Sequence, residues 1–308
     1  MIINYKSKTI EPAVNVLAFH GKSFRFASRF LSKKHLNDCA RLYRFCRFVD
    51  DLVDEESDIL LAQNKLDQLK QNLELGYSQI PVVQDFIELA KYYQMQPSVV
   101  SELIKGIESD LTPAQINNEA ELLRYCYRVA GTVGLLMCDV LGVKDPKARP
   151  HAIDLGIAMQ LTNIARDVME DAEKGRRYIP GKWVGRILPD RLPRASAAET
   201  EILKKSVKRL LSLANLYYES GAAGLGFLPP RARKGIQVAA IIYKEIGVVI
   251  EEKGYDVLSG RAYVNLVRKL HVAFRALMSN TSRRPYPSHK ASLHIYLKGL
   301  PHANNSAQ

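Results

Sequence analysis

Apolar side chains recur at intervals of three and four residues along most of the chain, and strict alternation of apolar and polar residues is rare. Spacing of three and four places side chains on one face of an α-helix, whereas alternation is typical of a β-strand. The pattern therefore predicts an all-α fold. We expect helices over the ranges 35–55, 58–76, 81–95, 98–108, 118–142, 150–174, 198–220, 232–253 and 259–279.

Glycines and prolines separate these predicted helices, among them Gly76, Gly142 with Pro146, and Gly175 with Pro180. No low-complexity linker divides the 308 residues, and no unit of about 20–50 residues repeats. The sequence therefore favours one domain over residues 1–308. Residues 280–308, which include NTSRRPYPSHK and PHANNSAQ, are expected to form a loosely ordered tail.

The charge balance restricts the kind of partner. Lysine and arginine total 44 against 32 acidic residues, a formal net charge of +12, and basic residues dominate residues 176–234 and 261–298. Such a charge favours anionic partners, and it is explained equally well by attraction to anionic lipid or by a need for solubility. Nucleic-acid binding is not expected, because no recognition module is present and aromatic residues do not alternate with the basic clusters. The sequence leaves the oligomeric state open.

The cysteines and the N-terminal segment indicate a cytoplasmic protein. Cys39, Cys46, Cys126 and Cys138 lack paired CxxC spacing and are expected to be reduced core residues. The first residues lack the pattern of a secretion signal, and no run approaches about 18 consecutive apolar residues. We expect no membrane-spanning helix, although contact with a membrane surface remains an alternative.

Two segments each gather charged or other polar side chains, most of them with oxygen atoms, on one helical face. In FCRFVDDLVDE (45–55), Arg47, Asp50, Asp51 and Asp54 fall within an arc of about 100°. In QLTNIARDVMEDAEKGRRYIP (160–180), an arc of about 100° holds five such residues. They are Gln160, Asn163, Asp167, Glu170 and Asp171.

Each stripe has two interpretations. It is either the solvated face of an amphipathic helix or half of a metal site, since carboxylate and amide oxygens one turn apart suit Mg²⁺, with Mn²⁺ as an alternative. An EF-hand is a poor match, because DDLVDEESD lacks the alternating ligands, the central glycine and the final glutamate. The following Arg176 and Arg177 either bind phosphate oxygens or complement the helix dipole, and for Arg177 the second interpretation is at least as good. Tyr178 is either a boundary residue with a satisfied hydroxyl or a phenol that points into the site.

At these residues the chain resembles the squalene and phytoene synthase family of head-to-head isoprenoid synthases. FVDDLVDE matches the family's DDxxD motif, and DVMEDAEKGRRYIP matches its DxxxD motif followed by GRxYxP. HGKSF, YCYRVAGTVG, LGIAMQLTNIARD, RARKGIQVAAIIYKEIG and GRAYVNLVRK are similar to further family segments. The resemblance covers most of the chain and implies a single helical isoprenoid synthase bundle with a central cavity.

The resemblance implies a reaction. Two geranylgeranyl diphosphates would be joined through a cyclopropyl diphosphate to phytoene, with proton loss and without NADPH. Alternatives are C30 dehydrosqualene or squalene formation from farnesyl diphosphate and a non-catalytic assembly factor of the same fold. A chain-elongating prenyltransferase fits less well, because it would lack the GRxYxP segment.

The resemblance also implies roles for individual residues. Asp50, Asp54, Asn163, Asp167 and Asp171 would bind metal, with Asp51 and Glu170 beside them. Diphosphate and substrate contacts would fall to Ser23, Phe24, Arg47, Tyr125, Gln160, Arg176, Tyr243, Arg261 and Lys269. The final proton would go to the released diphosphate, Tyr178 or Asp51. The small residues Ala130, Gly131, Gly134, Gly156 and Ala158 would either leave space for the hydrocarbon or allow close helix packing.

Overall fold

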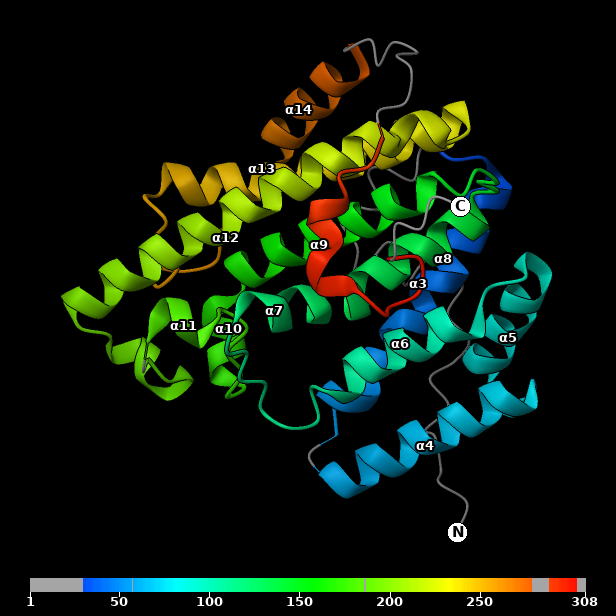
Figure 1. Cartoon of the computed structure of the whole chain (residues 1–308), viewed down its shortest axis with the longest axis horizontal. Coiled ribbons are helices and arrows are strands. Elements are labelled where there is room, and N and C mark those ends of the chain that lie inside the picture. Colours follow the sequence, from blue (N-terminus) through cyan, green and yellow to red (C-terminus); the bar gives the residue numbers. More distant parts are fainter. Residues whose placement is uncertain (1–29, 57, 186, 279–287, 304–308) are drawn as a thin grey trace.

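A computed structural model describes residues 30–56, 58–185, 187–278 and 288–303, and these residues fold into helices (Figure 1). This confirms the predicted all-α fold class for the described part of the chain. The elements in chain order are α3 (Lys33–Asp54), α4 (Ile59–Leu75), α5 (Pro81–Tyr93), α6 (Pro97–Glu108), α7 (Glu119–Cys126), the π-turn η1 (Tyr127–Gly131), α8 (Thr132–Val140), α9 (Ala148–Arg166), α10 (Val168–Glu173), α11 (Gly181–Val184), η2 (Pro189–Arg194), α12 (Ala197–Ala223), η3 (Gly224–Phe227), α13 (Pro230–Glu252), α14 (Leu266–Met278) and η4 (Ala291–Leu297).

Three predicted helices were wrong in detail. The range 259–279 begins only at Leu266, because Asn265 caps the helix: its side-chain oxygen accepts a 2.8 Å hydrogen bond from the Arg268 N–H. The range 150–174 divides at Asp167, whose φ of −103° and ψ of 17° leave the helical region. The range 118–142 contains η1, a wider turn than the three-and-four pattern predicts.

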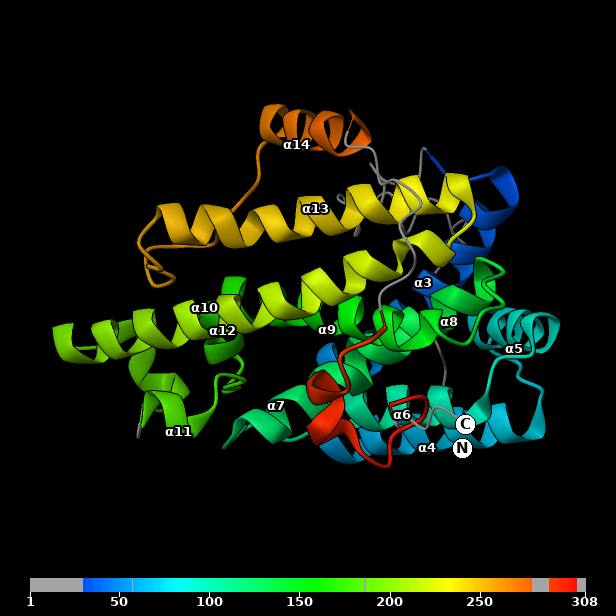
Figure 2. The ribbon, with the colours of Figure 1, turned by 45° about the horizontal axis from the view of Figure 1, so that its top comes forward.

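Helix α9 lies in the middle of the bundle, in contact with η1, α8, α12 and α13 (Figures 1 and 2). Helices α4 and α14 lie at opposite edges, α4 beside α3, α5 and α6, and α14 beside α13 (Figure 2). None of the helices in the described ranges is both long and apolar enough to cross a bilayer.

Two glycines allow α9 to approach the η1–α8 segment closely. A Cβ atom on Gly134 would lie 2.2 Å from the carbonyl oxygen of Ala152, and one on Gly156 would lie 2.2 Å from that of Ala130. Both distances are far inside van der Waals contact. Gly134, Gly156 and Ala130 also line the main cavity. At these positions the small residues therefore both allow close helix packing and leave space for the cavity.

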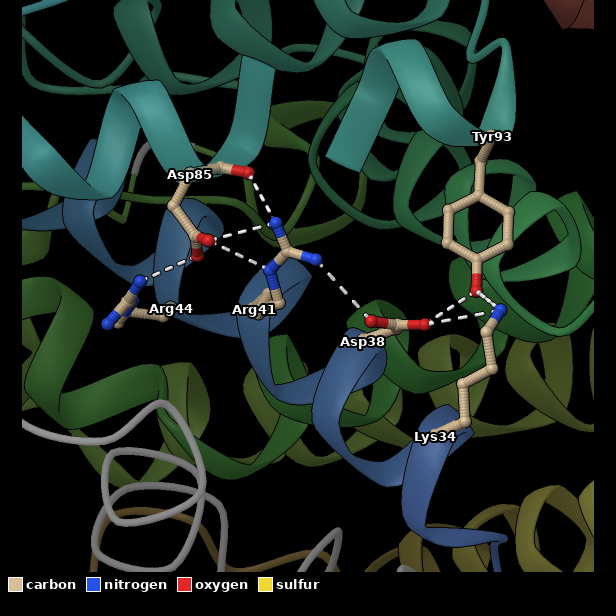
Figure 3. Close-up of polar contacts among 6 residues, drawn as sticks. All are labelled: Lys34, Asp38, Arg41, Arg44, Asp85 and Tyr93. Atoms are coloured by element: carbon tan, nitrogen blue, oxygen red, sulfur yellow. Dashed lines mark hydrogen bonds and ion pairs between the residues drawn. The ribbon is translucent and has the colours of Figure 1, made fainter. Parts of the chain in front are cut away.

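A polar network fixes the outer face of α3 against α5 (Figure 3). Asp85 of α5 accepts hydrogen bonds from Arg41 Nε at 2.9 Å and from Arg44 Nη2 at 2.6 Å. One turn earlier on α3, Asp38 accepts a 2.6 Å hydrogen bond from the hydroxyl of Tyr93. With this face held by α5, the face of α3 that carries Asp50 borders the cavity.

Residues 288–303 are packed against the bundle, so the prediction of a loosely ordered tail is wrong for this segment. Leu297 is fully buried. The hydroxyl of Tyr217 donates to the Leu293 carbonyl at 2.7 Å, and that of Tyr127 donates to the Pro301 carbonyl at 2.6 Å. The sequence did not indicate this packing, because its charged and small residues interrupt any regular spacing of apolar side chains.

Candidate active site

The acidic face of α3 is partly buried and borders the cavity. Arg47 forms an ion pair with Asp51 one turn away. Burial raises the pKa of Asp50 to about 7; Arg47 opposes this rise, and Asp54 and Asp51 add to it. Like charges held this close together favour a cation between them.

The second stripe continues across the break between α9 and α10. Asp167 forms hydrogen-bonded ion pairs with Arg166, at 2.7 and 2.5 Å, and lies 2.9 Å from Arg261 Nε. Arg261 also donates to Glu170 at 2.9 Å. Burial, followed by the charge of Asp167, raises the pKa of Asp171 to about 7.

The structure brings the two stripes together through Asp54. Its carboxylate accepts hydrogen bonds from Lys174 Nζ at 2.8 Å and from Arg176 Nη1 at 2.9 Å. Burial would raise the pKa of Asp54, but these two hydrogen bonds lower it below its ordinary value. The end of α3 is therefore joined to the turn after α10.

Asp110, at the end of α6, is a site residue that the sequence did not reveal. It accepts hydrogen bonds from the hydroxyls of Tyr125 at 2.9 Å and Tyr178 at 2.7 Å, and the two rings stack at 4.7 Å. Burial raises the pKa of Asp110, and its charge in turn contributes to the raised pKa values of Asp50 and Asp171. A single aspartate in SDLTP belongs to no helical stripe, so no sequence signal identified it.

The turn that carries Tyr178 is held by backbone pairing. Arg177 N–H donates to the Ala114 carbonyl at 2.7 Å, and Ile116 N–H donates to the Arg177 carbonyl at 3.1 Å. The Arg177 guanidinium donates to the Ile187 carbonyl at 3.2 Å rather than to a stripe carboxylate. Arg177 therefore has a structural position, whereas its neighbours Arg176 and Tyr178 face the acidic cluster.

An apolar cavity with about 1590 Å³ of empty space, its open mouth included, begins at these stripes. Asp50, Gln160, Asn163 and Tyr243 line its polar end. From Asn163 to Ala148 its wall follows one face of α9 for about 22 Å, at 1.5 Å per residue. The remaining wall is mainly apolar and includes Leu42, Val133, Met137, Met159, Ile236 and Ala239.

The donor set at the polar end fits a hard divalent cation. The side-chain oxygen of Asn163 is buried without a hydrogen-bond partner among the described residues, while its amide nitrogen donates to Gln160 at 3.3 Å. An unsatisfied buried oxygen is costly unless a donor or a cation meets it. Mg²⁺ and Mn²⁺ prefer oxygen ligands, and the Asn163 oxygen together with the neighbouring carboxylates of raised pKa would supply them.

Three predicted substrate contacts remain: Lys269, Ser23 and Phe24. Lys269 lies on α14, whose main helical neighbour is α13 rather than α3 or α10. Ser23 and Phe24 lie outside the described residues.

Comparison with known proteins agrees with this architecture. Residues 17–268 match the squalene/phytoene synthase family. The 15-cis-phytoene synthase of Pantoea ananas is 34% identical over 295 residues, which cover 91% of this chain and 96% of that protein. The phytoene synthase of Cereibacter sphaeroides is 35% identical over 260 residues, which cover 80% of this chain and 73% of that protein.

Solved structures share the fold. A dehydrosqualene synthase crystallised with a ligand superposes with a TM-score of 0.74 at 26% identity, covering 86% of this chain and 94% of that one. A squalene synthase from Alicyclobacillus acidocaldarius superposes with a TM-score of 0.68 at 20% identity, covering 79% of this chain and 93% of that one. At this identity the similarity shows the fold alone.

A helical bundle in which two acidic stripes meet at the end of a long apolar cavity defines an enzyme of the prenyltransferase class. The chain belongs to the squalene/phytoene synthase family, as its two motifs indicated.

Proposed function

We propose that this chain is a phytoene synthase that joins two geranylgeranyl diphosphates, through a cyclopropyl (prephytoene) diphosphate, to phytoene, the first committed step of carotenoid biosynthesis. The observation that carries the proposal is the continuity of the site, since Asp50 and Asn163 line one end of the same cavity whose other walls are apolar. Diphosphates would lie at the acidic end and the hydrocarbon chains along α9. The phytoene synthase relatives, one of them 34% identical over 91% of this chain, support the choice of substrate.

Asp50, Asp54, Asn163, Asp167 and Asp171 would hold Mg²⁺ or Mn²⁺, with Asp51 and Glu170 beside them. Bound there, the ions would stabilise the negative charge that develops on the leaving diphosphate.

The chain's own cations would act on the same charge. Arg176 lies against Asp54, and Arg261 lies against Asp167 and Glu170, so both guanidinium groups border the proposed metal ligands. Arg47, paired with Asp51, completes this rim. Because the carboxylates already hold these guanidinium groups in place, the groups would bind diphosphate oxygens without a large rearrangement.

The apolar cavity would protect the allylic cation from water. For the final proton, the released diphosphate is the acceptor that the geometry favours. The Tyr178 hydroxyl donates its proton to Asp110, and burial raises the pKa of Tyr178, so this phenol is neutral and a weak base. Asp51 is already engaged in an ion pair with Arg47.

The test is incubation of purified protein with Mg²⁺ and labelled geranylgeranyl or farnesyl diphosphate, with and without NADPH, followed by hydrocarbon analysis. We expect phytoene from geranylgeranyl diphosphate without NADPH, no product from Asp50→Ala or Asp167→Ala, and full activity in the surface control Asp190→Ala. Consumption of farnesyl diphosphate alone would replace the substrate with the C30 alternative. Inactivity with both, with Mn²⁺ and detergent also tried, would favour the assembly factor.

We further propose that the outer face of α14 contacts an anionic membrane, into which a C40 hydrocarbon can leave. Leu266, Val267, Phe274 and Met278 are 65–77% exposed along this helix, and Arg275 is exposed beside them. Such a helix, apolar on one face and basic at its side, suits the bilayer interface. We expect Phe274→Ser to reduce co-sedimentation with phosphatidylglycerol vesicles, whereas Leu60→Ser, at an apolar residue on α4 that is even more exposed, should not. Equal binding by both variants would refute this contact.

A further inference from the structure

A second polar cluster lies in the core, about 14 Å along the α9 axis from Asn163 at 1.5 Å per residue. It is formed by Asp154 of α9, which is fully buried, and by His289 and His294 of the 288–303 segment. Asp154 Oδ2 lies 2.7 Å from His289 Nε2 and accepts a 2.5 Å hydrogen bond from Ser220, and Oδ1 lies 2.8 Å from His294 Nε2. One ligand atom from each of the three residues falls within 4.8 Å of the others.

The second ring nitrogen of His294 restricts the protonation of this cluster. Nδ1 lies 3.3 Å from the carbonyl oxygen of Ala303, which can only accept a hydrogen bond. A neutral imidazole has one N–H, so either tautomer leaves one contact between two acceptors: Nε2 with Asp154 at 2.8 Å when the proton is on Nδ1, or Nδ1 with Ala303 at 3.3 Å when it is on Nε2. A second proton on His294, or a cation bound by both Nε2 and the carboxylate, removes this repulsion.

A cation matches the surroundings of His294. A histidine that binds metal through one nitrogen is commonly oriented by a hydrogen bond from the other to a backbone carbonyl, as Ala303 provides. Two imidazole nitrogens and one carboxylate form the donor set of three-ligand zinc sites, whereas Mg²⁺ prefers oxygen ligands. The cluster therefore selects a different metal from the carboxylate stripes.

We propose that Asp154, His289 and His294 bind one divalent transition-metal ion of the zinc type, with the Ser220 hydroxyl beside it. The ion joins α9 to a segment 135 and 140 residues further along the chain. The neighbouring α9 residues His151 and Leu155 line the apolar cavity, so the ion holds the 288–303 segment against the cavity wall. A metal that crosslinks distant segments stabilises the folded state.

The test uses the full chain without a histidine tag. The protein is stripped with a chelator, reloaded with zinc in the presence of excess Mg²⁺, and analysed for bound zinc by mass spectrometry. We expect about one zinc ion per chain in the wild type and in His271→Ala, an exposed histidine on α14, and affinity lower by more than about tenfold in His289→Ala and His294→Ala. Asp50→Ala should keep its zinc.

Two measurements on the wild type do not depend on the folding of variants. Reloading with Co²⁺ should give the visible absorption of a tetrahedral site, and zinc should slow hydrogen exchange in residues 288–303. The proposal is overturned if the wild type retains no zinc, with no change in exchange or melting temperature, because a doubly protonated His294 then holds the cluster. It is overturned equally if Asp50→Ala loses the zinc or if the histidine variants bind it as the wild type does.

Discussion

Asp54 and Arg176, 122 residues apart in the chain, form an ion pair in which Oδ1 and Nη1 are 2.9 Å apart. The same guanidinium donates through Nη2 to the carbonyl oxygen of Asp110 at 3.0 Å. Arg176 thus contacts the end of α3 and the end of α6 at once. A forked donor fixed at two points is well placed to bind a diphosphate oxygen beside the carboxylates.

Replacing Arg176 should therefore reduce catalysis more than stability. We expect Arg176→Ala to lower kcat/KM by about 100-fold or more, and Arg176→Lys to recover only part of it, because lysine keeps the charge but loses the fork. The neighbouring Arg177 is the matched control, since its guanidinium contacts the Ile187 carbonyl. Arg177→Ala should lower the melting temperature and leave kcat/KM of the folded protein nearly unchanged; equal kinetic losses in both variants would contradict the assignment.

Asp110 should act by positioning the two phenols. Asp110→Asn keeps the shape, but its amide can accept through only one oxygen, so the hydroxyls of Tyr125 and Tyr178 lose a charged acceptor. We expect kcat to fall by about 10–100-fold with KM changed less, because the geometry rather than the binding surface is altered. Tyr178→Phe in the Asp110→Asn background should add little further loss. If the losses of kcat from the two substitutions multiplied in the double variant, Asp110 would not act through Tyr178.

The stripe residues were predictable from sequence because their alignment is a property of one helix. Asp50 and Asp54 share a face whatever surrounds α3, and the same holds for Gln160 and Asn163 on α9. Asp110 could not be found in this way, since its role arises only where the end of α6 meets tyrosines from two other segments. The all-α class likewise follows from local periodicity, whereas the helix break at Asp167 and the packing of residues 288–303 depend on tertiary contacts.

Mg²⁺ binding should depend on pH through Asp50 and Asp171. Their folded-state pKa of about 7 lies above the ordinary value near 4, so from about pH 4 to 7 the metal-free folded state holds protons that the unfolded chain has released. Its stability therefore falls as the pH rises through this range. Mg²⁺ competes with the same protons, and its affinity should rise at least about tenfold between about pH 6 and pH 8.

Isothermal titration calorimetry at several pH values measures this affinity and the number of protons released. Asp50→Asn, which cannot titrate, should release fewer protons per Mg²⁺ than the wild type. An affinity for Mg²⁺ that does not change with pH would mean that neither carboxyl is displaced from its proton by the metal.

The crossing of α9 with the η1–α8 segment should tolerate no added side chain. In Gly156→Ala the new methyl group would lie 2.2 Å from the Ala130 carbonyl oxygen, so the backbones must move apart, at a cost of about 1–3 kcal/mol in the free energy of unfolding. Gly247→Ala on α13 is the matched control, because its Cβ would meet only the end of the Leu211 side chain, at 3.2 Å. Thermal unfolding should separate the two variants; a Gly156→Ala protein as stable as Gly247→Ala would show that the crossing can relax.

The depth of the cavity should select the length of the prenyl chain. Ala152 lines the cavity about 16 Å along α9 from Asn163, at 1.5 Å per residue, far enough from the acidic end to meet the last part of a long substrate. Ala152→Leu should shorten the cavity there and leave the stripes unchanged. Because added volume in a filled pocket costs about 1–3 kcal/mol, kcat/KM for geranylgeranyl diphosphate should fall about tenfold or more relative to that for farnesyl diphosphate. Competition between the two substrates, with products separated by chain length, measures this ratio directly. If the two rates fell together, the end of the chain would not reach Ala152, and another part of the wall would have to set the length.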